Sequence, residues 1–171
     1  MATSAVIYLQ AALGMTSLVI AIIFYMAWKT LGEKPWALNW SIAFVASTLY
    51  WLANLSSGAF PSHEAYWLTV NAFGLAMITL ALRGHCERSE CQNLPKNLWP
   101  YSALIFSIVV WTTLVRPHAG LSAAVLPVVA AISLFLSAAM IIRHREETRV
   151  AEWASAITMI IFAVMTLPAA V

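Results

Sequence analysis

Residues 5–28 read AVIYLQAALGMTSLVIAIIFYMAW, a run without a single charged side chain. The hydrocarbon core of a bilayer is about 30 Å thick, and about 20 residues of α-helix are needed to cross it. Because lipid offers no partner to free backbone groups, a crossing segment is either a helix or part of a closed β-barrel. The run does not alternate between polar and apolar residues as a barrel strand does. We therefore predict a membrane-spanning helix over 5–28.

Further along the chain, other apolar runs are long enough, or nearly so, to cross a membrane: 37–57, 65–83, 98–116, 120–142 and 151–171. The chain is 62% hydrophobic and 9% charged, whereas soluble domains carry about 25% charged residues. We predict an all-α polytopic membrane protein, a single domain over 1–171 whose six transmembrane helices form an antiparallel bundle. The lipid bilayer is its expected partner. The net charge of +2 is spread between apolar runs, so no nucleic-acid partner is predicted.

The positions of the basic residues predict the orientation of the chain. Lysine and arginine in short connections stay on the cytoplasmic side of a membrane. The odd-numbered connections hold all the basic residues except Arg116. We therefore expect the N-terminus outside and the odd-numbered connections in the cytoplasm. The last run ends as MTLPAAV, without a basic or polar anchor, and we expect the natural chain to continue past Val171.

The stretch LALRGHCERSECQ, residues 80–92, gathers residue types that bind metal. Thiolate and imidazole are preferred ligands of Zn²⁺, so His85, Cys86 and Cys91 form a candidate zinc site with His144 as a fourth ligand. The spacing is not that of a zinc finger, however. The alternative, which we favour, is a solvated cytoplasmic loop with two free thiols, since the cytosol keeps thiols reduced.

Haem is a second cofactor to weigh, because the histidines fall in two pairs, His63 with His118 outside and His85 with His144 inside. Paired histidines can ligate haem iron. Yet His63 and His85 are 22 residues apart, which is about 33 Å along a helix. That distance places them at opposite rims of the membrane, as interfacial residues. We therefore predict no cofactor.

Ionisable residues are missing from the middle of the apolar runs, which argues against a pump or an ion channel. The asparagines Asn39, Asn54 and Asn71 are expected to form hydrogen bonds between helices. Aromatic and amide side chains also gather in the outer halves of the second, third and fourth runs, which suggests a small-ligand pocket. Its candidate residues are Tyr50, Trp51, Asn54, Tyr66, Trp67, Asn71 and Trp111. An aromatic belt at the membrane surface is the alternative, and we favour it.

The order of these features resembles a known family. The stretches PWALNWSIAFVASTLYWLA (35–53) and YWLTVNAFGLAMITLALRG (66–84), separated by short connections, are similar to the N-terminal multi-helix membrane region that precedes GGDEF-type diguanylate cyclase domains in bacteria. The resemblance covers about residues 5–100. It implies a sensory and anchoring input module in the bacterial inner membrane, attached to a cytoplasmic domain that condenses two GTP into cyclic di-GMP. This chain contains no GGDEF signature, and no catalytic residues carry over.

We therefore expect a membrane-embedded sensory module of a signalling protein that acts through dimerisation. Whether an attached domain is an enzyme stays open. An accessory or structural subunit of a larger membrane complex is the first alternative, and a haem- or metal-binding membrane redox protein is the second.

Overall fold

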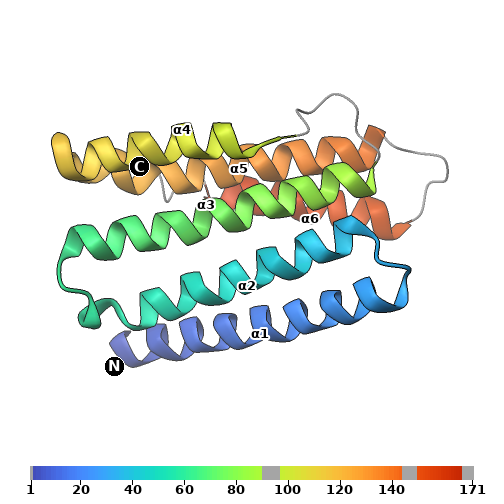
Figure 1. Cartoon of the computed structure of the whole chain (residues 1–171), viewed down its shortest axis with the longest axis horizontal. Helices are drawn as coiled ribbons and strands as arrows, with labels where there is room; N and C mark the ends of the chain where they lie inside the picture. The colour runs from blue at the N-terminus through green and yellow to red at the C-terminus, as the bar shows by residue number, and fades with distance from the viewer. Residues whose placement is uncertain (1, 90–96, 144–149, 167–171) are drawn as a thin grey trace.

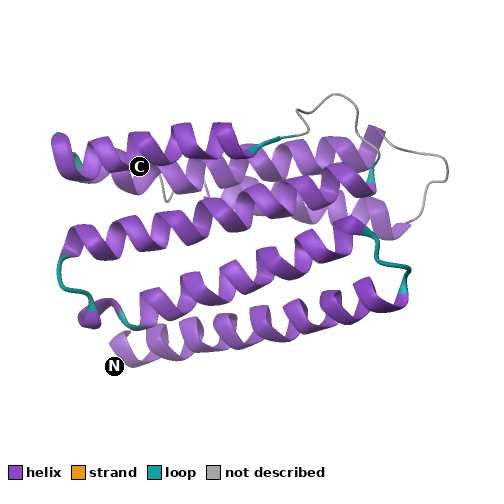
Figure 2. Cartoon of the chain, in the orientation of Figure 1, coloured by secondary structure: helices purple, strands orange, loops and turns teal. Residues whose placement is uncertain are grey.

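The computed structural model describes residues 2–89, 97–143 and 150–166. Within these ranges the chain is helical, with no strand (Figure 2). The elements are α1 (Ala2–Thr30), α2 (Pro35–Leu55), the 3₁₀ turn η1 (Ser57–Ala59), α3 (His63–Arg88), α4 (Trp99–Val110), the π-helical turn η2 (Trp111–Val115), α5 (Ala119–Arg143) and α6 (Val150–Thr166).

Each predicted run overlaps one of these α-helices, so the all-α class is confirmed. In the ranges that the structure describes, three helices are long and apolar enough to cross a membrane: Ser4–Thr30, His63–Arg88 and Gly120–Ile142. The segments Trp99–Val115 and Trp153–Met165 are apolar but shorter. The six crossings predicted from the sequence are therefore supported for three helices and stay a proposal for the others.

Helices α1, α2, α3 and α4 form a row in which each is antiparallel to the next, and α5 and α6 lie behind α4 and α3 (Figure 1). Helix α2 packs between α1 and α3, α3 contacts both α4 and α5, and α6 packs along α5. Helices α1 and α6 therefore lie at the two ends of this series of contacts. Below, the end that contains the turn between α1 and α2 is called the Gly32 end, and the end that contains η1 is called the Gly58 end.

Small side chains allow α1 and α2 to approach closely. Gly14, Ser17 and Ala21 follow one another at helical spacing on α1, and all three are buried. The hydroxyl groups of Ser17 and Ser47 lie 3.0 Å apart, and Ser41 Oγ donates to the Ala21 carbonyl at 2.9 Å. Small and hydroxylated residues are typical of helix contacts in membranes, where close packing and hydrogen bonds replace the hydrophobic effect.

The connection between α1 and α2 is a tight turn at the Gly32 end. Gly32 and Glu33 have φ angles of 74° and 58°, which lie in the left-handed region where glycine is favoured at a helix C-terminus. The Glu33 amide donates to the Trp28 carbonyl at 2.9 Å. Pro35 then starts α2, a position where its missing N–H costs nothing. At the opposite end, Ser62 caps α3 by accepting a hydrogen bond from the Ala65 amide, as N-cap serines do.

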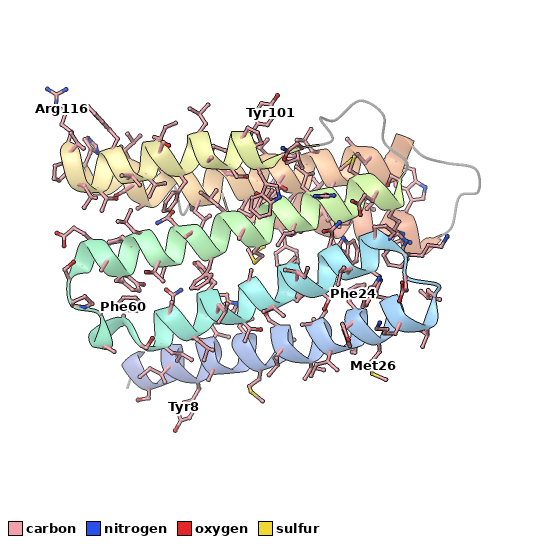
Figure 3. The ribbon with its side chains drawn as sticks, viewed as in Figure 1. Tyr8, Phe24, Met26, Phe60, Tyr101 and Arg116 are labelled. Atoms are coloured by element: carbon pink, nitrogen blue, oxygen red, sulfur yellow. The ribbon has the colours of Figure 1, made fainter. Side chains whose placement is uncertain are left out.

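Large apolar side chains cover the outer faces of the helices. On α1, Tyr8 is 75% exposed and Met26 is 61% exposed, and both point away from α2 (Figure 3). Similar exposed side chains occur on α4, α5 and α6. Contiguous apolar surfaces of this kind mark contacts with lipid or with other proteins.

Candidate functional site

Side chains from α2, α3 and the connection between them meet at the Gly58 end in a group that we call the Tyr66 cluster. Its members are Tyr50, Asn54, Phe60, His63, Tyr66 and Trp67. The Tyr66 hydroxyl donates to Asn54 Oδ1 at 2.8 Å, and Asn54 Nδ2 donates to the Tyr50 carbonyl at 2.8 Å. Asn54 therefore joins the C-terminal turns of α2 to the first turns of α3, as expected for an interhelical asparagine.

The aromatic rings of the Tyr66 cluster lie against one another. The ring centroids of Phe60 and Tyr66 are 5.7 Å apart at an interplanar angle of 67°, and Phe60 lies at the Gly58 end in Figure 3. The Trp67 indole N–H donates to His63 Nε2 at 2.5 Å. Edge-to-face contacts of this kind contribute about 0.5–1.5 kcal/mol beyond the buried area. The cluster therefore holds the short connection between α2 and α3 in one arrangement.

The structure brings together only part of the pocket predicted from the sequence. Tyr50, Asn54, Tyr66 and Trp67 all belong to the Tyr66 cluster. Trp51 faces α1 instead, where its Cβ lies 3.4 Å from the position that a Cβ on Gly14 would take. Trp111 starts the π-helical turn and is 57% exposed.

Asn71, the remaining predicted pocket residue, is 1% exposed. Its Nδ2 donates to the Trp67 carbonyl of the same helix at 2.9 Å, so the interhelical bond predicted for Asn71 is not present among the described contacts. Its Oδ1 is buried without a partner, as is Thr113 Oγ1 on η2. Buried oxygens that lack a donor cost free energy, which makes them places where a polar ligand or a water molecule would be stabilised.

A second group, which we call the Trp40 cluster, lies toward the Gly32 end. Its rings are those of Phe24, Trp36, Trp40 and His85. The Trp40 ring lies 4.8 Å from Phe24 and 4.6 Å from His85, measured between centroids. Gly84 allows this contact, because a Cβ at this position would lie under 3.0 Å from Trp40. Trp40 Nε1 is buried without a hydrogen-bond partner.

Next to the Trp40 cluster, polar side chains connect α2 to the last turns of α3. Asn39 Nδ2 donates to Glu87 Oε2 at 2.7 Å, and Arg83 Nε donates to Glu87 Oε1 at 3.0 Å. Arg88 lies over the Trp36 ring, 6.0 Å from its centroid. The interhelical hydrogen bond predicted for Asn39 is therefore confirmed, and its partner is a carboxylate that the sequence analysis did not single out.

The stretch expected to be a cytoplasmic loop begins later than predicted. Helix α3 continues to Arg88 rather than ending near residue 83, because the Arg83–Glu87 pair and the bond from Asn39 stabilise its last turns. Consequently His85 and Cys86 are helical, and His85 is 8% exposed rather than solvated. Cys91 and His144, the other two proposed zinc ligands, lie outside the described residues. Within those that are described, no three His, Cys, Asp or Glu side chains gather as metal ligands would.

The histidines weighed as haem ligands have structural roles where they are described. His63 accepts the Trp67 indole N–H, and His118 Nδ1 accepts the Leu121 amide at 3.2 Å, which caps the start of α5. His85 lies against the Trp40 ring. These contacts give the rings hydrogen-bonding and packing partners, and none of them is a contact between two histidines.

No family model matches the chain, and neither a curated protein nor a solved structure gives a significant match. Hydrogen bonds and aromatic contacts lie at both ends of the α2–α3 pair. Contacts of this kind can bind a polar or aromatic group and hold it in position.

Proposed function

We propose that the chain is the sensory and anchoring module of a bacterial signalling protein, with six membrane crossings and the Gly32 end in the cytoplasm. The observation that supports it best is the pair of hydrogen-bonded connections between α2 and α3. Tyr66 and Asn54 form one at the Gly58 end, and Asn39 and Glu87 form the other at the Gly32 end. We expect these two connections to transmit a movement of the helices at one end of the pair to the other end.

The contacts between the two connections favour movement of α2 and α3 as whole helices over local rearrangement of side chains. Ala43 and Ala46 are buried on α2, and Gly84 brings the α3 backbone against Trp40. Close-packed helices move as rigid bodies, because interiors at this density are not continuously deformable. A ligand that competes for the Tyr66 hydroxyl or for Asn54 would shift α2 relative to α3. It would do so only to the extent that it binds one arrangement better than the other.

The output proposed for this module is control of cyclic di-GMP synthesis, by a cytoplasmic domain that follows a seventh membrane crossing beyond α6. The proposal rests on the resemblance of 35–53 and 66–84 to the membrane regions of diguanylate cyclases. In a homodimer, a shift of α3 would change how two attached domains face each other. Sequencing the transcript downstream of codon 171 tests this part. An open frame that encodes a GGDEF-type domain supports it, and a stop codon directly after Val171 overturns it.

Coupling between the two ends can be measured with spin labels. Lys34 and Arg88 are exposed at the Gly32 end on α2 and α3, so cysteines placed there report the distance between the two helices. The native thiols are first removed as Cys86→Ser and Cys91→Ser. Pulsed electron paramagnetic resonance then gives the distance distribution in lipid nanodiscs, with and without a substitution at the far end.

The far-end substitution is Tyr66→Phe, which removes only the hydroxyl that Asn54 accepts. Tyr101→Phe is the matched control, because this hydroxyl lies on an exposed side chain of α4. The sensory proposal predicts a shifted or broadened Lys34–Arg88 distribution in Tyr66→Phe and an unchanged one in Tyr101→Phe. Identical distributions in both variants, or equal changes in both, would overturn it.

A specific observation also favours the accessory-subunit alternative. Helices α1 and α6 each pack mainly against one neighbour, and their outer faces carry exposed side chains such as Tyr8 on α1 and Phe162 on α6. A partner chain could cover these faces instead of lipid. Stoichiometric copurification with other membrane chains after mild solubilisation supports this alternative, and purification as a single species removes it.

A further inference from the structure

A groove of about 370 Å³ lies between α3, α4 and α5, away from both clusters. Helices α4 and α5 each pack on α3 but make little contact with each other. They therefore form two walls above a floor supplied by α3. The floor lies between Ile78 and Leu82, and the walls lie between Leu98 and Ile105 on α4 and between Val129 and Leu136 on α5.

The chemistry of the groove suits a hydrocarbon. Most of its lining is aliphatic, and the hydroxyl groups are those of Tyr101, Thr79, Ser102 and Ser133. Thr79 donates to the Leu75 carbonyl and is hydrogen-bonded to Ser102. Pockets for polar ligands contain a few polar groups placed to fix the ligand's orientation. Here Thr79 on the floor and Ser102 on the α4 wall are already hydrogen-bonded to each other, which leaves few groups to hold a polar molecule.

The direction of the groove matches that of a lipid chain. Each wall runs from its first to its last lining residue over seven helical steps, 98 to 105 at α4 and 129 to 136 on α5, which is about 10 Å of helix. It starts at the Gly32 end, where Leu98 directly precedes α4, and runs along the helices toward their middle. In a membrane it would lie parallel to the acyl chains of one leaflet. Trp99 and Tyr101 lie near its start, 45% and 56% exposed, as expected for aromatic residues at a membrane surface.

The groove is also open to its surroundings along the side, since Leu136 on its rim is 40% exposed. A chain can therefore enter from the bilayer without any opening of the helices. Arg83 follows Leu82 of the floor and has 42% of its side chain exposed, although its Nε is paired with Glu87. A partly neutralised cationic group therefore lies near the level of the lipid phosphates. The lining, the direction and the lateral opening of the groove all fit a single acyl chain.

We propose that this groove binds one acyl chain of a phospholipid from the leaflet at the Gly32 end. The inference rests on the proposal that the chain spans a membrane but not on its proposed sensory role. A bound lipid would fill the space between α4 and α5 and would hold α4 against α3. The groove is thus a lipid-binding site, distinct from the general contact that α1 makes with the bilayer.

The test uses the purified full chain in detergent and a phosphatidylglycerol that carries a diazirine in the middle of one acyl chain. Irradiation attaches bound lipid covalently, and mass spectrometry counts and locates the adducts. We expect saturable labelling that approaches one lipid per chain, at peptides from the α4 and α5 walls, and its loss when unlabelled phosphatidylglycerol is added in excess. Labelling that does not saturate, or that spreads evenly over the exposed face of α1, would overturn the proposal.

Two adjacent substitutions on α5 provide a matched pair. Leu136→Trp adds bulk at the rim of the groove, whereas Phe135→Trp changes a side chain that is similarly exposed, 42% against 40%, but does not line it. We expect Leu136→Trp to lower the labelling several-fold and Phe135→Trp to leave it unchanged, with the same helix content by circular dichroism. Equal labelling of both variants would contradict the proposal. If Leu136→Trp fails to fold, saturation and competition in the unmodified chain decide the question.

Discussion

Replacing Gly84 with alanine should destabilise the chain, although alanine is the better helix former. The added Cβ would lie under 3.0 Å from the Trp40 ring, a separation at which something must move. The ring has little freedom to do so, because Phe24 and His85 lie against it, with centroids 4.8 and 4.6 Å away. Either α2 moves away from α3, or the ring turns out of the cluster.

The expected magnitude follows from two opposing effects. Overpacking a close-packed interior costs about 1–3 kcal/mol. Replacing glycine inside a helix contributes up to about 1 kcal/mol in the opposite direction. The clash is therefore the larger effect, and we expect Gly84→Ala to lower the free energy of unfolding by about 1–2 kcal/mol. A loss of this size changes the ratio of folded to unfolded chains by a factor of about 5–30.

Two other glycines calibrate the measurement. A Cβ on Gly14 would lie 3.4 Å from Trp51 Cβ, an ordinary contact, and a Cβ on Gly74 would lie 2.6 Å from the flexible end of Leu126. We expect Gly14→Ala to be neutral or slightly stabilising, Gly74→Ala to be intermediate and Gly84→Ala to be the least stable. Unfolding in mixed micelles with increasing dodecyl sulfate, followed by circular dichroism, gives the order. If Gly84→Ala is as stable as Gly14→Ala, the close approach of α2 and α3 is not as described.

Substitutions at three further contacts between the helices are each followed by the same unfolding measurement. Tyr66→Phe and Asn54→Leu should each cost about 0.6 kcal/mol, and the double variant should lose less than the sum because both changes remove one hydrogen bond; strictly additive losses would mean that the bond contributes nothing. Asn39→Asp should cost more than Asn39→Ala, since it places a second carboxylate against Glu87, and equal losses would refute the proximity of these two groups. Ser17→Leu should destabilise the contact between α1 and α2 by about 1–3 kcal/mol, because a larger side chain does not fit this interface; an unchanged stability would show that the interface is loosely packed.

The positions of the helices could be predicted from the sequence because apolar runs of this length have few alternatives. Their ends were less predictable. The third run stops being apolar at Arg83, but its helix continues to Arg88. The backbone hydrogen bonds of a helix do not depend on apolar side chains. The contacts that stabilise the extra turns of α3 involve the side chains of Glu87 and Asn39. Contacts with a different helix are not visible in a local run of sequence.

Part of the candidate site could be predicted as well. Tyr66 and Asn54 were expected near each other, and the structure joins them directly. Trp111 was expected with them but starts a π-helical turn and is 57% exposed, and local composition gives no sign of such a turn. The Trp40 cluster was missed altogether. A glycine at position 84, near the end of α3, was the available signal that another side chain comes close.

The central claim, that the helices cross the membrane alternately, is tested most directly by the accessibility of single cysteines. Lys34, Gly58 and Arg116 are exposed in the first, second and fourth connections. Each is replaced by cysteine in a chain that carries Cys86→Ser and Cys91→Ser, and intact cells are treated with a maleimide that does not cross membranes. The account predicts labelling at positions 58 and 116 and protection at position 34 until the cells are opened. Labelling of position 34 in intact cells, or protection of position 58, would show that α2 does not cross in the proposed direction.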